Sequence, residues 1–494
     1  MKINYLGIGF VMAILSLMSL TTYANGKKED YDAAIQWKKW EHNIKATDKS
    51  IGTDGRPVTV HVVFEGPSGQ KFINSAFTDD AETYIFRAAF PDFGIWRWRT
   101  VCSDRSNPEL NNIRGTIEVT KYVGSNPLYK HGDLRVSEDK RHLVYADGSP
   151  FLWLGDSGWN VTLKSTMKEW KYYIDTRAMQ EFSVIQINPR GTGNKLTASA
   201  DPYVSFKSNG KNDPSFWRDL EDKIEYANMK GIIVFVAGVG SAWRDTMAVN
   251  KQNLKFEDYV SGRLAAHMVI FSPAFDQQFS DDLDKIAAEL KKTSTHLVTQ
   301  HPHEEFTTNN TFRNTTAVDF SGIQSGEHKG KIEDVYKSAR QWPLDIYNTA
   351  PTKPVINIEA VYDGRGNDDG PDSRAKDARK TSWIAWLSGA MGFTYGAGEL
   401  PPRVARGNGA VWNFNKDSTT YDYWVNALLW PSAGYMTKLR DFLGTIEWWN
   451  LIPAHELVRN QENADSLKMV VSKNNDYSMV VAYMPDNPTL VLDM

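Results

Sequence analysis

Cysteine is nearly absent from this sequence, because Cys102 is the single cysteine among 494 residues. One thiol excludes an internal disulfide, a Cys-ligated zinc site and an iron–sulfur cluster. An excess of charge of one sign is also missing: 56 Lys and Arg residues face 60 Asp and Glu residues, and the formal net charge is −4. This balance argues against disorder and excludes a polybasic protein, so no nucleic-acid partner is expected.

Long hydrophobic runs are missing as well, except near the N-terminus. There an apolar run from Tyr5 to Leu20 follows the charged Lys2 and precedes a small-residue segment that ends at Ala24. This order predicts a cleavable signal peptide over residues 1–24. The run is short for a membrane anchor, which is the alternative interpretation. We therefore expect a periplasmic or secreted bacterial protein with no membrane span in the mature chain.

Short alternating runs separated by turn residues follow, and they show no helical period. The clearest alternates apolar and basic residues over 95–101, as a half-buried strand does. Strands at this spacing predict a β-sandwich, which we assign to residues 25–125. The strands are expected at 57–64, 83–90, 95–101 and 115–119.

From residue 126 to residue 453 the rhythm changes to strand followed by helix. Eight such units favour a (β/α)8 barrel, and a dinucleotide-binding fold is excluded because no G-x-G-x-x-G turn follows the first strand. Residues 454–494 predict a short C-terminal β-region, either a small domain packed on the barrel or a truncated product. The barrel strands are expected at 151–156, 184–188, 232–237, 268–271, 296–299, 317–320, 354–358 and 392–395, with helices at 166–181, at 214–230 and from Asp281, capped by Ser280.

Catalytic side chains of such barrels emerge where the strands end. Two carboxylates satisfy this condition on well-separated strands, Asp276 after the fourth and Glu359 at the end of the seventh. Such a pair suits glycoside hydrolysis, in which one group protonates the leaving oxygen and the other attacks C1 or activates water. The alternatives are an ion pair of Glu359 with an arginine such as Arg365, and a helix-capping role for Asp276.

Other polar or aromatic residues at strand ends are predicted to contact the substrate. For Asp156 the alternative is a residue that orders a loop. No cofactor and no metal are expected, although His301 and His303, with Asp319 or His328, could ligate a metal in a rival hydrolase site. The predicted substrate contacts are Asp156, Trp159, Asn188, His301, His328 and Tyr395.

Several motifs also carry a resemblance to known families. Residues 36–105, with WKKWE at 37–41, FEGPSG at 64–69 and FPDFGIW at 90–96, resemble the domain of unknown function 5060 of bacterial exported glycosidases. Residues 127–450 resemble the apiosidase-like glycoside hydrolase barrels, also known as domain of unknown function 4038. The matching motifs there are FLWLGDSGW at 151–159, KPVINIE at 353–359 with Tyr362 after it, and SGAMGFTYG at 388–396.

This resemblance implies a retaining glycosidase in which Asp276 is the acid/base and Glu359 the nucleophile. Apiosidases are expected to carry Gly-Gly before the acid, whereas this chain has Ser-Pro-Ala-Phe at 272–275, so apiose specificity is not carried over. The expected partner is a polysaccharide or oligosaccharide. A carbohydrate-binding protein that has lost catalysis is the alternative, and the sugar, the linkage and the oligomeric state stay open.

Overall fold

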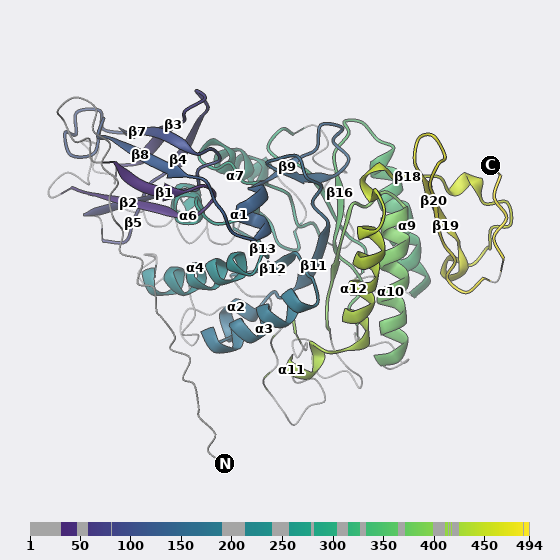
Figure 1. Ribbon diagram of the computed structural model, residues 1–494. Coiled ribbons are helices and arrows are strands. Elements are labelled where there is room, and N and C mark those ends of the chain that lie inside the picture. The colour runs from purple at the N-terminus through teal and green to yellow at the C-terminus, as the bar shows by residue number, and fades with distance from the viewer. Residues whose placement is uncertain are drawn as a thin grey trace, which may run out of the picture.

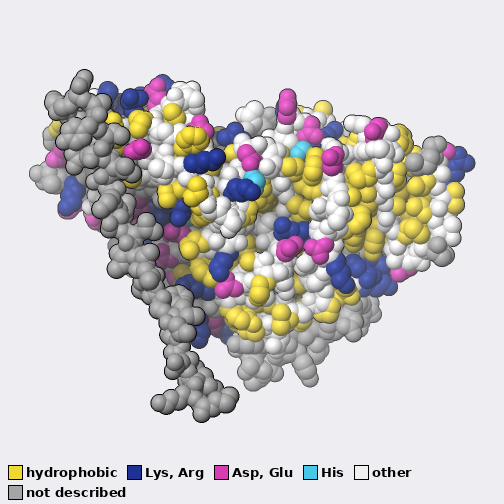
Figure 2. Space-filling view, viewed as in Figure 1, with side chains coloured by type: hydrophobic (Ala, Val, Ile, Leu, Met, Phe, Trp, Pro, Cys, Tyr) yellow, Lys and Arg dark blue, Asp and Glu magenta, His cyan; other side chains and the backbone are white. Residues whose placement is uncertain are grey.

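The computed structural model describes most of the chain beyond the predicted signal peptide. The described residues are 31–46, 58–80, 82–189, 213–239, 256–277, 281–303, 315–326, 332–363, 371–398, 411–412, 414, 416, 424–487 and 489–493. Within these ranges no helix is both long enough and apolar enough to cross a membrane. Figure 2 shows acidic and basic side chains interspersed over one face, as the near-neutral composition predicts.

Two sheets form the N-terminal end of the molecule (Figure 1). One has five strands in the order β1-β8-β7-β3-β4, and the other has three in the order β2-β6-β5. Along β7, Trp96 and Trp98 are buried, whereas Arg97 and Arg99 are exposed, because only one face of the strand meets the core. The predicted strand-rich region is therefore confirmed, and its boundary at residue 125 stays a prediction. The strands are β1 (Asp32–Ile35), β2 (Trp40–Lys45), β3 (Val60–Glu65), β4 (Lys71–Ser75), β5 (Phe77–Thr78), β6 (Thr83–Ala88), β7 (Gly94–Cys102) and β8 (Arg114–Thr120).

Seven parallel strands form the central sheet, in the order β14-β13-β12-β11-β17-β16-β15. A short helix α1 (Pro127–His131) and the hairpin of β9 (Leu134–Val136) and β10 (Leu143–Tyr145) precede them. This sheet confirms the predicted TIM-like α/β class. The strands are β11 (Trp153–Ser157), β12 (Val184–Ile187), β13 (Ile233–Ala237), β14 (Val269–Ser272), β15 (Ser321–Gln324), β16 (Val355–Glu359) and β17 (Gly392–Tyr395). The helices are α2 (Val161–Lys164), α3 (Met167–Met179), α4 (Pro214–Met229), α6 (Phe256–Leu264), α7 (Asp281–Lys292), α9 (Ile332–Tyr347), α10 (Pro371–Leu387), α11 (Trp424–Ala427) and α12 (Pro431–Gly444).

The fifth and sixth predicted strands need correction. The run 296–299 is no regular strand, but Val298 forms a parallel bridge to Phe271 of β14 and accepts the backbone N–H of Asp319 on its other side. It therefore fills the place between β14 and β15. The sixth strand is β15 rather than 317–320. A Cβ at Gly322 of β15 would lie 2.6 Å from Cδ1 of Ile358, so this strand needs a glycine, which weakens its sequence signal.

Alternation along the strands divides their side chains between two layers. Trp153, Val184 and Phe235 belong to the cluster inside the ring of strands. Leu154 and Ile185, one residue further along, belong to the cluster between the strands and the helices. A polar side chain at a strand end is therefore expected to point inward if it lies an even number of residues from the inward-pointing residue of its strand, and toward the helices if that number is odd.

The C-terminal strands pack against the helix layer, at the opposite end of the molecule from the N-terminal sheets (Figure 1). The ring of Trp383 on α10 stacks on Tyr483 with centroids 5.5 Å apart, and Ser472 donates a hydrogen bond to the carbonyl of Leu387. These contacts favour a β-region packed on the barrel. The strands are β18 (Ile452–Pro453), β19 (Val470–Lys473) and β20 (Val480–Tyr483), with 3-10 turns at Trp448–Asn450, His455–Leu457 and Asp465–Leu467.

Candidate active site

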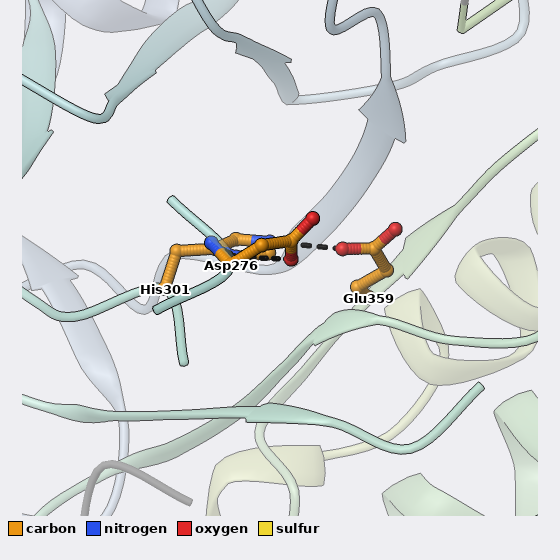
Figure 3. A group of neighbouring side chains, drawn as sticks. All are labelled: Asp276, His301 and Glu359. Atoms are coloured by element: carbon orange, nitrogen blue, oxygen red, sulfur yellow. Dashed lines mark hydrogen bonds and ion pairs between the residues drawn. The ribbon is translucent and has the colours of Figure 1, made fainter. Parts of the chain in front are cut away.

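Asp276, His301 and Glu359 meet where the barrel strands end (Figure 3). Nε2 of His301 lies 3.0 Å from Oε2 of Glu359, and its Nδ1 lies 3.5 Å from Oδ1 of Asp276. One ligand atom of each of the three residues lies within 4.8 Å of the other two. The two carboxylates predicted as the catalytic pair therefore face one short gap, and His301 contacts both.

Glu359 reaches this gap because of a bulge in β16. Ile356 and Ile358 point into the barrel, so simple alternation would turn Glu359 toward the helices, as it turns Val355. However, Ile323 of β15 pairs with Asn357 and the next pair is Gln324 with Glu359, which leaves one extra residue in β16. A bulge of this kind changes the direction of the side chain that follows it.

Asp276 and His301 are held by the loop that follows β14. The buried Ser272 hydroxyl accepts the backbone N–H of His301 at 2.9 Å and donates to the carbonyl of Ala274 at 2.7 Å. Phe275 stacks on the imidazole of His301, with the ring centroids 5.0 Å apart. Asp276 has a left-handed backbone with φ of 49°, which Asp tolerates better than most residues. The segment 272–275, where this chain has Ser-Pro-Ala-Phe in place of the expected Gly-Gly, therefore fixes both Asp276 and His301.

A second layer of side chains orients Glu359. Tyr362 donates its hydroxyl to Oε1 of Glu359 at 2.5 Å, and Nε1 of Trp159 donates to the Tyr362 oxygen at 2.7 Å. Trp159 is 2% exposed and meets the ring of His301 edge-on, with centroids 4.9 Å apart. These contacts place Trp159 behind the carboxylates rather than on an open platform. Tyr362 was not predicted as a site residue, although its position three residues after Glu359 is visible in the sequence.

The environments of the two carboxylates separate their roles. Burial and the charge of Glu359 raise the pKa of Asp276 to about 6, although His301, His303 and a hydrogen bond from Gln324 act the other way. Burial alone lowers the pKa of His301, but the hydrogen bond and charge of Glu359 and the charge of Asp276 outweigh it and raise that pKa. Asp276 is thus suited to hold a proton, and Glu359, facing an imidazole and a hydroxyl donor, is suited to act as a carboxylate.

The structure corrects two predicted substrate contacts, Asp156 and Tyr395. On their strands both alternate with side chains that point into the barrel, so they point toward the helices. Asp156 is fully buried; its Oδ2 lies 2.8 Å from Nε of Arg177 and accepts the Tyr173 hydroxyl at 2.6 Å. The Tyr395 hydroxyl lies 2.8 Å from Oγ of Ser432 on α12. These contacts favour a structural role for both residues, as the alternative interpretation of Asp156 proposed.

Two other predicted contacts stay predictions. Asn188 is fully buried at the end of β12, and its backbone N–H donates to the carbonyl of Trp159 at 2.9 Å, which places it in the inner wall beside the site. His328 lies outside the described residues, as do Ser280 and Arg365.

The role of Asp156 gives a stability prediction. Asp156→Asn removes the charge that faces the buried guanidinium of Arg177, so it is expected to lower the free energy of unfolding by about 3–5 kcal/mol. Chemical denaturation measures this change. The KM of the residual folded enzyme should stay near that of the wild type, and a raised KM at unchanged stability would restore Asp156 as a substrate contact.

Asp319 does not complete the rival metal site, and His328, the other candidate, lies outside the described residues. Asp319 pairs with Lys291 at 2.9 Å and accepts the backbone N–H of Val298. In the part of the chain that the structure describes, the three residues placed close enough to hold a metal are instead Asp276, His301 and Glu359. There the hydrogen bond and charge of Glu359 and the charge of Asp276 outweigh burial and raise the pKa of His301, which favours its protonated form. A protonated imidazole has no free lone pair for a cation, so this arrangement suits orienting a carboxylate rather than ligating a metal.

Solved structures of glycoside hydrolases share this fold. A putative glycoside hydrolase from Bacteroides vulgatus matches with a TM-score of 0.64 at 17% identity, over 84% of this chain and 79% of that one. A glycoside hydrolase family 5 protein from the same organism matches with a TM-score of 0.59 at 19% identity, over 75% and 84% of the two chains. At these identities the likeness shows the fold alone. A search of curated proteins finds no match to this chain.

A family model described as the apiosidase-like catalytic domain matches residues 137–450. The match begins after the N-terminal sheets, so their resemblance to the domain of unknown function 5060 stays a prediction. It spans the barrel strands and all three residues of the site. Because it covers well over half of the sequence, this chain belongs to the apiosidase-like catalytic domain family.

Proposed function

We propose that this protein is an exported glycoside hydrolase that cleaves glycosidic bonds in a polysaccharide or oligosaccharide with retention of configuration. Glu359 is the nucleophile and Asp276 the general acid/base. One observation carries the proposal: an oxygen of Asp276 and an oxygen of Glu359 lie within 4.8 Å of each other. Carboxyl groups of retaining glycosidases lie about 5–5.5 Å apart, whereas inverting enzymes need about 6.5–9.5 Å to admit a water.

The first step transfers the proton of Asp276 to the glycosidic oxygen while Glu359 attacks C1. The C1–O bond breaks, the leaving group departs as an alcohol, and a covalent glycosyl ester forms on Glu359. Tyr362 and His301 hold the attacking carboxylate in place through the contacts at its two oxygens. In the second step Asp276 takes a proton from a water that attacks C1, and Glu359 is released.

The alternative of a carbohydrate-binding protein without catalysis depends on Asp276 pointing away from the site. Instead, the loop after β14 directs Asp276 toward His301 and Glu359 (Figure 3). Its side chain keeps 37% of its surface exposed, so a substrate oxygen has access to it. Hydrolysis is therefore the better supported function.

The stereochemical outcome tests the proposal. A panel of polysaccharides is first screened for released reducing sugar, and the cleaved glycan is then followed by 1H NMR in the first minutes of reaction. The anomer formed first should have the configuration of the bond that is cleaved. Initial release of the opposite anomer would overturn the retaining mechanism.

The pH dependence follows from the acid role of Asp276. Only its protonated form can donate, so kcat/KM is expected to fall as the pH rises through about 6, the pKa of Asp276. The positive charge of His301 lowers that pKa, so His301→Gln should move this alkaline limb to higher pH. Profiles of kcat/KM for the two proteins measure the shift. A limb that stays in place or moves to lower pH would contradict the assignment.

A further inference from the structure

A groove of about 570 Å³ lies where the barrel meets the C-terminal sheet. Its walls come from the hairpin that contains Arg141, the end of α9 at Tyr347, residues 447–452 and the turn 474–478. Gly389 contacts Tyr347 and lies just before β17 begins, so the groove is near the N-terminal ends of the strands. Asp276 and Glu359 lie at the C-terminal ends of β14 and β16. The groove is therefore at the opposite end of the barrel from the catalytic pair, and its volume suits a small ligand or a few sugar units.

Two half-buried aromatic rings line this groove, Trp449 and Tyr347. The buried ring of Trp448 packs edge-on against Trp449, with centroids 5.8 Å apart. The guanidinium carbon of Arg141 lies 3.8 Å from the centroid of the Tyr347 ring, and its Nη1 donates to the Tyr347 carbonyl at 2.6 Å. Trp449 is thus held before any ligand arrives, so little side-chain entropy is lost when an apolar sugar face packs on it, whereas Arg141 covers one face of the Tyr347 ring.

Apart from Leu451 and Ile452, the remaining lining is polar and suits hydroxyl groups. Asn450, Asn474 and Asn475 contribute amides, and carboxylates come from Asp139, Glu447 and Asp476. Among the described residues of the lining, Arg141 is the one cation, and it is engaged with Tyr347. The excess of carboxylates disfavours a uronic acid or another anion and accepts hydrogen bonds from neutral hydroxyls.

The turn between β19 and β20 also carries Tyr477, which lies in the sequence between the lining residues Asp476 and Ser478. Tyr477 is 46% exposed, and Nζ of Lys473 lies 3.8 Å from its ring centroid. Its φ of 59° is a left-handed conformation that is costly for a bulky residue and that glycine would adopt without strain. The turn therefore keeps an exposed aromatic side chain at a position where stability alone favours glycine.

We propose that this groove is a second glycan-binding site, which holds a neutral polysaccharide chain on the enzyme away from the catalytic centre. The choice of a glycan as ligand rests on the proposed function, whereas the neutral charge and the location rest on the groove itself. A polymer bound here remains attached while other segments of it reach the barrel mouth. The gain in local concentration then applies to polymers and not to short oligosaccharides.

Native affinity electrophoresis of the full chain tests the site. Glu359→Gln is used as the background so that the probe survives, and the gels contain galactomannan, xyloglucan, mixed-linkage β-glucan or polygalacturonate. We expect at least one neutral polymer to retard Glu359→Gln, and addition of Trp449→Ala to weaken that binding at least about fivefold. Asn475→Arg, at an exposed position of the turn, should weaken it as well without removing a packed ring. Phe93→Ala, at an exposed aromatic on the N-terminal sheets, should leave binding unchanged.

Three results would overturn the inference: no retardation by any neutral polymer, retardation that both groove variants leave unchanged, or retardation by polygalacturonate alone. Hydrolysis separates this inference from the proposed function. Trp449→Ala should keep the wild-type kcat/KM on a short oligosaccharide and show a raised KM on the polymer. If the wild type releases no sugar but polymer binding depends on Trp449, the proposed function fails and the glycan-binding groove is supported. If the wild type hydrolyses the glycan but binding does not depend on Trp449, the groove proposal fails and the proposed function is supported.

Discussion

Glu359→Gln is expected to lower kcat by about 10⁴-fold or more on any glycan that the wild type cleaves. An amide cannot attack C1, and no other carboxylate among the described residues of the site lies in its place. The shape of the side chain is kept, and its carbonyl oxygen can still accept the Tyr362 hydroxyl. Steady-state kinetics and a thermal melt measure the two effects, and the melting temperature should change little.

A matched variant shows whether the loss is specific. Glu456→Gln makes the same chemical change at an exposed position in a 3-10 turn of the C-terminal region. It should keep the activity of the wild type. A Glu359→Gln enzyme with full activity would remove Glu359 from the mechanism, whatever the melting temperature shows.

Asp276→Asn is expected to lower kcat/KM by about 10²–10⁴-fold on a natural glycan, where the leaving oxygen needs a proton. On an aryl glycoside of the same sugar with an acidic phenol as leaving group, the first step needs no such help. Formation of the glycosyl ester should therefore be much less affected, and added azide should accelerate its breakdown because azide attacks C1 without a general base.

The comparison between the two substrates is the critical readout for Asp276. A merely structural Asp would reduce turnover of both substrates equally, and azide would rescue neither. Asp281→Asn, an exposed position at the start of α7, serves as the matched control and should resemble the wild type on both substrates. Equal losses for the glycan and the aryl glycoside would contradict the acid/base role.

The proposed catalytic pair, Asp276 and Glu359, could be singled out in the sequence because both residues lie where a strand ends. A carboxylate that directly follows the strand-like run Val355–Ile358 is recognisable without a structure, and so is an Asp a few residues after β14. The bulge that turns Glu359 into the gap was not predictable, because it depends on the register between β15 and β16. The sequence therefore located the two carboxylates that meet in the structure, without the geometry that makes them face each other.

Asp156 and Tyr395 were assigned to the wrong side of their strands for a physical reason. All five residues of β11 and all four of β17 are buried, since one face meets the barrel interior and the other meets the helices. A strand buried on both faces shows no alternation of polar and apolar residues, so its sequence does not show which way a side chain points. In β7, by contrast, one face meets solvent, and the alternation over 95–101 predicted the strand correctly.

The proposed mechanism requires Glu359 to form a covalent bond to the sugar. A 2-deoxy-2-fluoro glycoside of the cleaved sugar with an activated leaving group would slow the second step more than the first, so the ester accumulates. Peptide mass spectrometry of the inactivated enzyme should then find the added mass of the fluorosugar on the peptide that contains Glu359, and specifically on that residue. A label on any other residue, or full hydrolysis without a trapped ester, would contradict the account.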